Sequence, residues 1–337
     1  MTVIDDIIEK YKINVQTGTQ IAAAKPTIIP VSPAIDIALN GGIPEGSFNV
    51  LTGEEKSGKT LTALWIAANA QAKYDKKLYP KGRNVYFFGI EGRLKPRDLA
   101  GIPHLDLTKF HQIVSEQGKI LSAEDYLDSA DIVIRNDPGC VVIIDSFSSL
   151  CTEAEMLATM KDMQRADGPK LLAKFCRKVA NVIPINKVIL IGITHLMSNV
   201  TGYGAKYQEK SGNAIKYQSD NKLRVKKYEL LPKNSAKPTG QSVEWSVEFS
   251  ALGAPGMSAT SYITYGIGID VGKELAKLAI DLGIIKKKGS WYSFEDQTVY
   301  TDGKYQGQEN IADIINTDKK LQAKLQREIY EICGLKT

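Results

Sequence analysis

Residues 53–60 combine the residue types that can hold a triphosphate. They read G-E-E-K-S-G-K-T, with an apolar run before them and a helix-forming run after them. In that context the loop N–H groups and the helix N-terminus bind an anion, Lys59 reaches the β- and γ-phosphates, and Thr60 binds Mg²⁺. The predicted phosphate-binding positions are Gly53, Glu54, Glu55, Lys56, Ser57, Gly58, Lys59 and Thr60. A chance glycine turn is the alternative, and these flanking runs argue against it.

Three further polar residues follow apolar runs of strand type. Glu91 comes after VYFFGI, Asp145 after CVVII, and His195 after VILIGIT. Asp145 would share Mg²⁺ with Thr60, Glu91 would polarise the attacking water, and His195 would hydrogen-bond the γ-phosphate. Each assignment has an alternative, because an apolar strand often ends in Asp, a strand-end Glu can be a surface residue, and His195 can be a core histidine.

The elements around these residues predict an α/β fold. Continuous apolar strands alternate with helical patterns, which is typical of a parallel sheet with helices on both faces. Ligands bind such sheets at the carboxyl ends of the strands, so we expect the four polar sites to converge at one edge. Residues 222–252 predict two shorter strands, and the chain from 262 onward predicts a small α+β domain. The expected division is 1–31, 32–261 and 262–337.

The first residues predict a short amphipathic helix over 3–12. Val3, Ile4, Ile7, Ile8 and Tyr11 recur at helical spacing. A helix this short is marginal in water on its own. It therefore needs an apolar surface to pack on, either its own core or a neighbouring subunit.

The composition limits the class of protein. The 337 residues are 43% hydrophobic and 24% charged, and no apolar run reaches the length of a membrane span. The four cysteines lack metal-ligand spacing, so we expect a cytoplasmic protein with reduced thiols and no membrane partner. Residues 222–237 carry five lysines and one arginine against one glutamate. A polyanion partner and a solvated charged face both explain that segment.

Several motifs together resemble the RecA family of recombinases. They are SPAIDIALNGGIPEG before the loop, FFGIEGRLKP around Glu91, VVIIDSFSSL around Asp145, SGNAIKY at 211–217, and DLGIIKKKGSWYSF with GQEN near the C-terminus. The resemblance implies a RecA-like P-loop ATPase core, an N-terminal subunit-docking helix and an α+β C-terminal domain. Lys59, Glu91 and His195 are then the expected catalytic residues.

The same resemblance implies a function in DNA recombination and repair. We expect a DNA-dependent ATPase that uses ATP and Mg²⁺, forms a helical filament on single-stranded DNA, and exchanges strands with homologous double-stranded DNA. A ring-forming P-loop motor of the helicase kind is one alternative. A non-hydrolysing, ATP-gated coat protein for single-stranded DNA is the other.

Two DNA-binding loops are also implied by the resemblance. The first lies within 153–168, where methionines would wedge between bases, and the second is 197–213, with lysines for phosphates and tyrosines for stacking. The expected DNA-binding residues are Met156, Met160, Met163, Tyr203, Lys206, Tyr207, Lys210, Ser211, Gly212 and Asn213. A helix with its methionines in the core and a surface loop without DNA are the alternatives. Lys286–Lys288 would contact incoming duplex, or form a solvated turn.

The chain departs from the bacterial pattern of the family in two places. His195 stands where glutamine is usual, as in phage recombinases of the family. The lysines that reach a neighbour's ATP are missing from VEFSALGAP, which presents Phe249, Ser250 and Ala251 instead. Lys216 and Arg224 are the nearest substitute cations by sequence.

Overall fold

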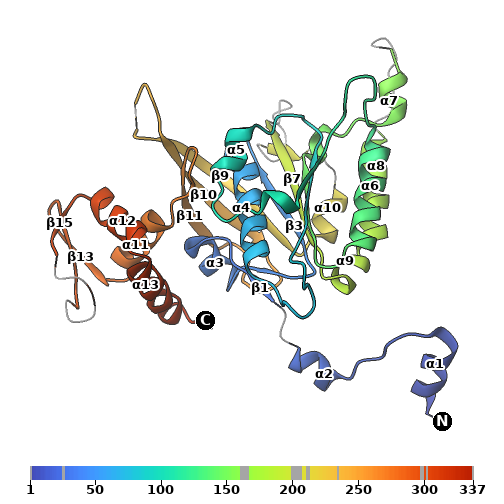
Figure 1. Cartoon of the computed structure of the whole chain (residues 1–337), viewed down its shortest axis with the longest axis horizontal. Coiled ribbons are helices and arrows are strands. Elements are labelled where there is room, and N and C mark those ends of the chain that lie inside the picture. The colour runs from blue at the N-terminus through green and yellow to red at the C-terminus, as the bar shows by residue number, and fades with distance from the viewer. Residues whose placement is uncertain are drawn as a thin grey trace.

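The computed structural model describes residues 2–24, 27–159, 167–198, 207–209, 213–233, 235–296, 300 and 303–335. A large sheet with helices on both faces forms the centre, a smaller C-terminal unit lies beside it, and an N-terminal arm extends away from it (Figure 1). Over the described residues, no helix combines the length and apolarity that crossing a bilayer requires. The α/β class predicted from the alternating pattern is confirmed.

The central sheet has the strand order β12-β11-β10-β9-β3-β7-β6-β4-β5, and β8 pairs with β7. The parallel part contains β9 (Asn221–Leu231), β3 (Phe48–Gly53), β7 (Ile189–Ser198), β6 (Val141–Asp145), β4 (Val85–Gly89) and β5 (Phe110–Ile113). The antiparallel extension contains β10 (Gly240–Phe249), β11 (Ser258–Thr264) and β12 (Gly268–Ile269). Since β3 is buried along its whole length, its apolar run reflects helices on both faces.

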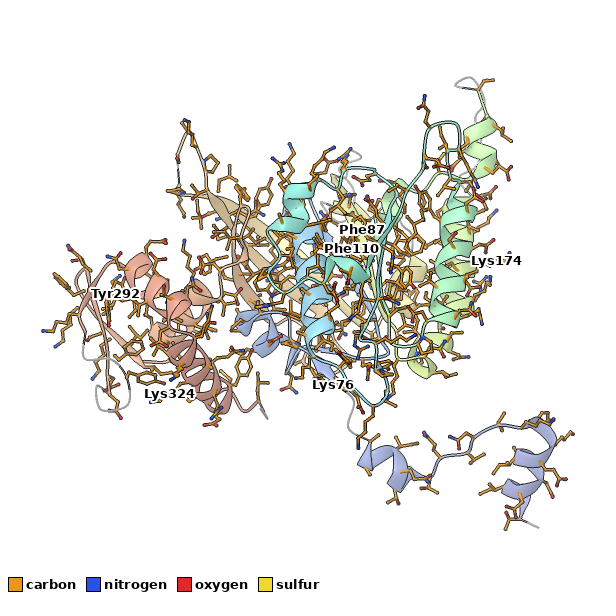
Figure 2. The ribbon with its side chains drawn as sticks, viewed as in Figure 1. Lys76, Phe87, Phe110, Lys174, Tyr292 and Lys324 are labelled. Carbon is orange, nitrogen blue, oxygen red and sulfur yellow. The ribbon has the colours of Figure 1, made fainter. Side chains whose placement is uncertain are left out.

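Two helical layers cover the sheet. One core cluster joins the sheet to α3 (Pro33–Leu39) and α4 (Lys59–Ala72), and it also packs the short α5 (Pro96–Ala100). A second cluster on the other face contains residues of α6 (Ala123–Asn136), α8 (Gly168–Val179), α9 (Val182–Ile185) and α10 (Asn213–Gln218). The helix α6 is capped at its N-terminus, because Ser122 and Asp125 form a reciprocal capping box. Figure 2 shows side chains packed around the sheet and labels Phe87 and Phe110 among them. The centroids of these two rings lie 6.0 Å apart.

The C-terminal unit has its own apolar core. It contains α11 (Val271–Asp281), β13 (Ile285–Lys288), β14 (Trp291–Phe294), β15 (Tyr305–Gln306), α12 (Gln308–Thr317) and α13 (Lys319–Ile332). Its three strands form a separate antiparallel sheet. The strand β11 crosses the expected boundary between residues 261 and 262, and the large sheet ends only at Ile269.

Two buried carboxyl groups join α3 to the C-terminal unit. Asp36 accepts hydrogen bonds from Val31 N at 2.6 Å and Tyr330 Oη at 2.7 Å. Glu274 accepts from Ala34 N at 2.9 Å and Ser261 Oγ at 2.5 Å. Burial raises the pKa of each to about 7, so each side chain tends to keep its proton.

The N-terminal arm carries two helices, α1 (Val3–Tyr11) and α2 (Gly18–Ala23), and the predicted first helix is confirmed. Neither helix has a buried residue. On the apolar face of α1, Val3 is 75% and Tyr11 60% exposed. The helix therefore does not pack on its own protomer's core. Two short strands, β1 (Ile28–Ile29) and β2 (Ile43–Pro44), pair with each other where the arm joins the core.

Candidate active site

The phosphate-binding loop lies between β3 and α4. The strand ends at Gly53 and the helix begins at Lys59, so the glycine-bounded segment forms the strand–loop–helix turn that the sequence predicts. Gly58 has φ of 90°, and a Cβ atom there would lie 2.5 Å from Ile263 Cδ1. A side chain at this position would therefore be strained and would collide with β11. Ser57 Oγ donates to Glu54 O at 2.7 Å and closes the loop.

Lys59 points back into this loop. Its Nζ donates to Gly53 O at 3.0 Å and to Glu54 O at 2.5 Å, and the residue is only 4% exposed. Burial lowers its pKa to about 8, although the carboxylates of Asp145 and Glu91 oppose that shift. An anion placed in the loop would favour the charged ammonium, since opposite charges stabilise each other most where water is excluded.

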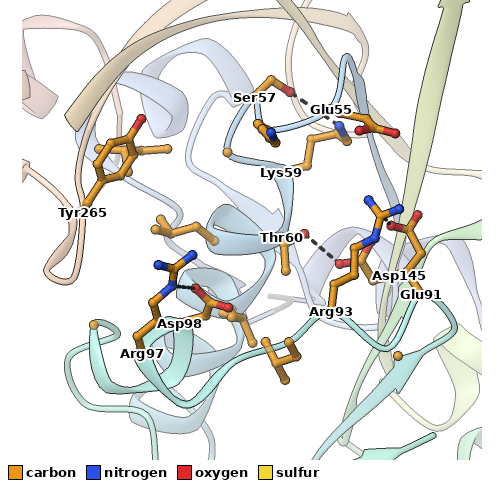
Figure 3. Close-up of a pocket in the computed structure, with 18 of the residues that line it drawn as sticks. Glu55, Ser57, Lys59, Thr60, Glu91, Arg93, Arg97, Asp98, Asp145 and Tyr265 are labelled. Atoms are coloured by element: carbon orange, nitrogen blue, oxygen red, sulfur yellow. Dashed lines mark hydrogen bonds and ion pairs between the residues drawn. The ribbon is translucent and has the colours of Figure 1, made fainter. Parts of the chain in front are cut away.

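The two predicted metal ligands are in contact. Thr60 Oγ1 donates to Asp145 Oδ2 at 2.7 Å, as Figure 3 shows. Burial raises the pKa of Asp145, so a nearby cation would favour its ionised form. Hydroxyl and carboxylate oxygens at a phosphate site are the ligands that Mg²⁺ prefers. The side chains at this position therefore fit Mg²⁺.

Glu91, Asp145 and His195 converge beside the loop. One ligand atom from each lies within 4.8 Å of the others. They are brought together by the adjacent parallel strands β4, β6 and β7, whose carboxyl ends share one edge of the sheet. His195 Nε2 lies 2.9 Å from Glu91 Oε1. Because a carboxylate can only accept, we assign the Nε2–H tautomer to His195.

The hydroxyls of two serines also hold Glu91. Ser146 Oγ donates to Glu91 Oε1 at 2.9 Å and Ser149 Oγ donates to the same atom at 2.8 Å. Burial raises the pKa of Glu91, but the hydrogen bonds from Ser149, Ser146 and His195 outweigh it and leave the pKa below its ordinary value. Arg93 Nη1 lies 3.3 Å from the other oxygen, Oε2. Both serines belong to the motif SFSSL, whose sequence by itself indicates no contact with Glu91.

These groups line one end of a cavity of about 650 Å³ (Figure 3). Arg97, Asp98 and Tyr265 line it farther from Glu91 and Asp145. Tyr265 Oη donates to Gln241 Oε1 at 3.1 Å, and Arg97 Nε lies 3.6 Å from Asp98 Oδ1. A cavity of this size can hold a whole nucleoside triphosphate, with its base and sugar as well as its phosphates. These residues come from α5, β10 and the turn after β11, so no local pattern in the sequence predicts that they line one cavity.

The first predicted DNA segment begins with α7 (Glu153–Leu157), which has no buried residue. Met156 is 39% exposed, so the alternative of a methionine packed in the core is wrong at this position. Met160 and Met163 lie outside the described residues.

The second predicted DNA segment follows His195. Its described part includes β8 (Tyr207–Glu209), which pairs antiparallel with β7 so that Tyr207 opposes Ser198. Asn213 begins α10. Tyr203, Lys206, Lys210, Ser211 and Gly212 lie outside the described residues, and their DNA contacts stay predictions.

Acidic partners neutralise part of the basic segment on β9. Lys222 is 2% exposed with its Nζ 3.0 Å from Glu248 Oε2, and Arg224 Nη1 lies 3.5 Å from Glu248 Oε1. Lys216 of α10 is exposed. The role of either Lys216 or Arg224 at a neighbour's ATP stays a prediction.

Comparison with known proteins identifies the family. The family model described as RecA N-terminal domain matches residues 4–270, and the RecA C-terminal domain matches 273–334. Protein RecA of Nitratidesulfovibrio vulgaris strain DP4 is 27% identical over 99% of this chain and 89% of its own length. Protein RecA of the Miyazaki F strain is 30% identical, with coverages of 91% and 82%, and that of Bacillus velezensis FZB42 is 28% identical, with 96% and 87%. Both domain models match the chain in order, and the phosphate-binding site lies within the first of them. The chain therefore belongs to the RecA family and is an ATP-dependent DNA recombinase.

Proposed function

We propose that this chain polymerises on single-stranded DNA with ATP and Mg²⁺, pairs the filament with homologous double-stranded DNA, and exchanges the strands. The main support is that Glu91 and His195 touch at 2.9 Å beside the phosphate loop. Each is connected to a segment that is predicted to hold DNA: Ser149, bonded to Glu91, precedes α7, and His195 lies in β7, which leads into the second segment. Nucleotide and DNA therefore have a short physical connection.

Each residue of the site has a distinct role in this proposal. Lys59 offsets phosphate charge, and Thr60 with Asp145 would hold Mg²⁺, which would draw negative charge from the β- and γ-phosphates. Glu91 accepts the proton of the attacking water. His195 donates to Glu91 in the structure, and it exchanges that partner for the γ-phosphate when nucleotide binds. Loss of the γ-phosphate therefore changes the hydrogen bonding of His195, which lies just before the second DNA segment.

Assembly uses the N-terminal arm. The apolar face of α1 has no partner among the described residues of its own chain, so we assign it to the surface of an adjacent protomer. The proposed division is a docking segment (1–31), an ATPase core and a C-terminal domain. The end of the large sheet at Ile269 favours a core boundary near residue 270 over the expected 261. Action on cellular DNA places the protein in the cytoplasm.

Electron microscopy of the full chain tests the filament. With single-stranded DNA and a non-hydrolysable ATP analogue we expect regular helical filaments, and without nucleotide we expect none. Closed rings that form without DNA would instead identify a motor of the helicase kind. Filaments from a protein that lacks ATP turnover would identify a coat protein.

A further inference from the structure

Three hydrogen-bond donors meet on a single oxygen of the catalytic glutamate. Ser149 Oγ, Ser146 Oγ and His195 Nε2 lie 2.8, 2.9 and 2.9 Å from Glu91 Oε1. Every donor stabilises the ionised carboxylate and reduces its tendency to take a proton from water. Together they hold the side chain of Glu91 against the turn after β6.

Ser149 differs from the other two donors in its exposure. Ser146 is 0% exposed and follows the predicted metal ligand Asp145, so water is not at hand to replace Glu91 as the partner of its hydroxyl, which also lies 3.1 Å from Ser149 Oγ. The His195 side chain is 20% exposed and its backbone belongs to β7. Ser149 is exposed, and its hydroxyl can bond to water instead at little cost. Ser149 is therefore the donor that Glu91 can lose most easily.

Ser149 is also the donor nearest to a predicted DNA contact. It ends the 3-10 turn Phe147–Ser149, and only residues 150–152 separate it from α7. Thr152 caps α7, and Cys151 O accepts a hydrogen bond from Ala123 N at 2.7 Å. A connection of three residues spans about 10 Å at most, so a displacement of α7 is transmitted to Ser149 over a short distance.

We propose that Ser149 is a positioning residue that restrains Glu91, and that DNA bound at α7 releases the restraint. This inference rests on the proposed function, because it needs hydrolysis that DNA stimulates. With Ser149 bonded, Glu91 Oε1 is a weaker proton acceptor and turnover is slow. When α7 moves, the Ser149 hydroxyl bonds to water instead, and Glu91 Oε1 is freed to accept the proton of the attacking water.

The test compares steady-state ATP turnover with and without single-stranded DNA in wild type, Ser149→Ala and Ser149→Thr. We expect Ser149→Ala to raise the DNA-free kcat about three- to tenfold, since one hydrogen bond to a charged group is lost. The DNA-stimulated kcat and the KM for ATP should stay unchanged, so the stimulation ratio falls by the same factor. Ser149→Thr keeps the hydroxyl and should behave as wild type. A protein that merely misfolds would lose activity rather than gain it.

A second substitution ties the gain to Glu91. In the double variant Ser149→Ala/Glu91→Gln the rise in DNA-free turnover should disappear. The proposal is overturned if Ser149→Ala leaves the DNA-free turnover unchanged or lowers it, if Ser149→Thr acts like Ser149→Ala, or if the rise persists without Glu91. A wild type that DNA fails to stimulate would count against the proposed function instead, and the DNA-free comparison would still test the restraint.

Discussion

Lys59 and Lys56 belong to the same loop but have opposite surroundings. Lys59 is buried with its ammonium bonded to loop carbonyls, whereas Lys56 is exposed. We expect Lys59→Ala to weaken ATP binding about 10- to 100-fold, because it removes charge-assisted hydrogen bonds to the phosphates. Titration with a fluorescent ATP analogue measures this. Lys56→Asn removes an equal charge and suits the positive φ of 58° there, so it should change the affinity less than about twofold. Equal losses in the two variants would count against the assignment of Lys59.

Among the described residues, no neighbour of Glu91 is placed to replace it in the proton-accepting role that we propose for it. Asp145 is bonded to Thr60, and His195 donates its Nε2 proton to Glu91. Glu91→Gln keeps the shape and the acceptor for the two serines, so kcat should fall about 10²–10⁴-fold while nucleotide and DNA affinities are retained. Rapid-quench turnover together with a DNA-binding assay measures both. Ordinary turnover in this variant would assign the general base elsewhere.

At the residue scale, the sequence predicts those site residues that lie close together along the chain. The eight loop positions and the strand-end Asp145 are encoded in contiguous residues, so their pattern predicts the loop and its neighbour. The hydrogen bond between Ser149 and Glu91 joins residues 58 positions apart, and nothing in the segment SFSSL indicates that Ser149 contacts Glu91. Arg97, Asp98 and Tyr265 line the cavity because α5 and β11 approach each other in the fold, which no single segment encodes.

The helix α1 can be tested by exchanging residues on its two faces. Ile4 and Ile8 lie on the exposed apolar face, whereas Asp6 and Lys10 are polar residues of the same helix. We expect Ile4→Ser/Ile8→Ser to abolish filaments while the unfolding temperature stays within about 2 °C of wild type, because neither side chain is buried in the protomer. Negative-stain microscopy and thermal unfolding measure the two effects. Asp6→Ser/Lys10→Ser is the matched control and should still polymerise. Normal filaments from the first variant would contradict the docking role.

The contact between α3 and α11 should make stability depend on pH. In the folded chain the pKa of Glu274 is about 7 because of burial, against 4.5 ordinarily. The folded state therefore holds a proton between about pH 4.5 and 7 that the unfolded state releases, and the free energy of unfolding falls as pH rises through this range. Above pH 7 the loss is complete.

Glu274→Gln imitates the protonated side chain and should remove the part of this dependence that Glu274 causes, whereas Asp36, whose pKa burial also raises to about 7, keeps its own part. We expect a gain of about 1–3 kcal/mol in the free energy of unfolding at pH 8, and little change at pH 4. Urea unfolding of the full chain at both pH values measures it. Glu309→Gln alters a 73% exposed glutamate of the same unit and is the control, with a change below about 0.5 kcal/mol. An unchanged pH dependence in Glu274→Gln would show that another group is responsible.

At the element scale, the long apolar strands and the amphipathic helices were predictable because each carries its own periodicity. The strand β5, with the sequence FHQI, was missed because it is short and half polar. Its place is set by pairing with β4, whose Val85 lies opposite Phe110. The strands β1 and β2 contain two residues each and exist only through their mutual pairing.

At the scale of the whole molecule, the large sheet gathers nucleotide chemistry at one edge and leaves two other regions for partners. The arm with α1 extends from the core, and the C-terminal unit stands beside the antiparallel end of the sheet (Figure 1). The exposed apolar helix, together with the bond from Ser149 before α7 to Glu91 beside the phosphate loop, suits a protein that works as a polymer on DNA.

Strand exchange is the measurement that tests this account most directly. The full chain is first assembled on single-stranded DNA with ATP and Mg²⁺, and then mixed with a duplex whose strands carry a fluorescence donor and quencher. The account predicts that fluorescence rises as the labelled strand is displaced from a homologous duplex, and that a duplex of unrelated sequence and Lys59→Ala both give no rise. Filaments that form normally but displace no strand from the homologous duplex, or displace strands equally from the unrelated one, would contradict it.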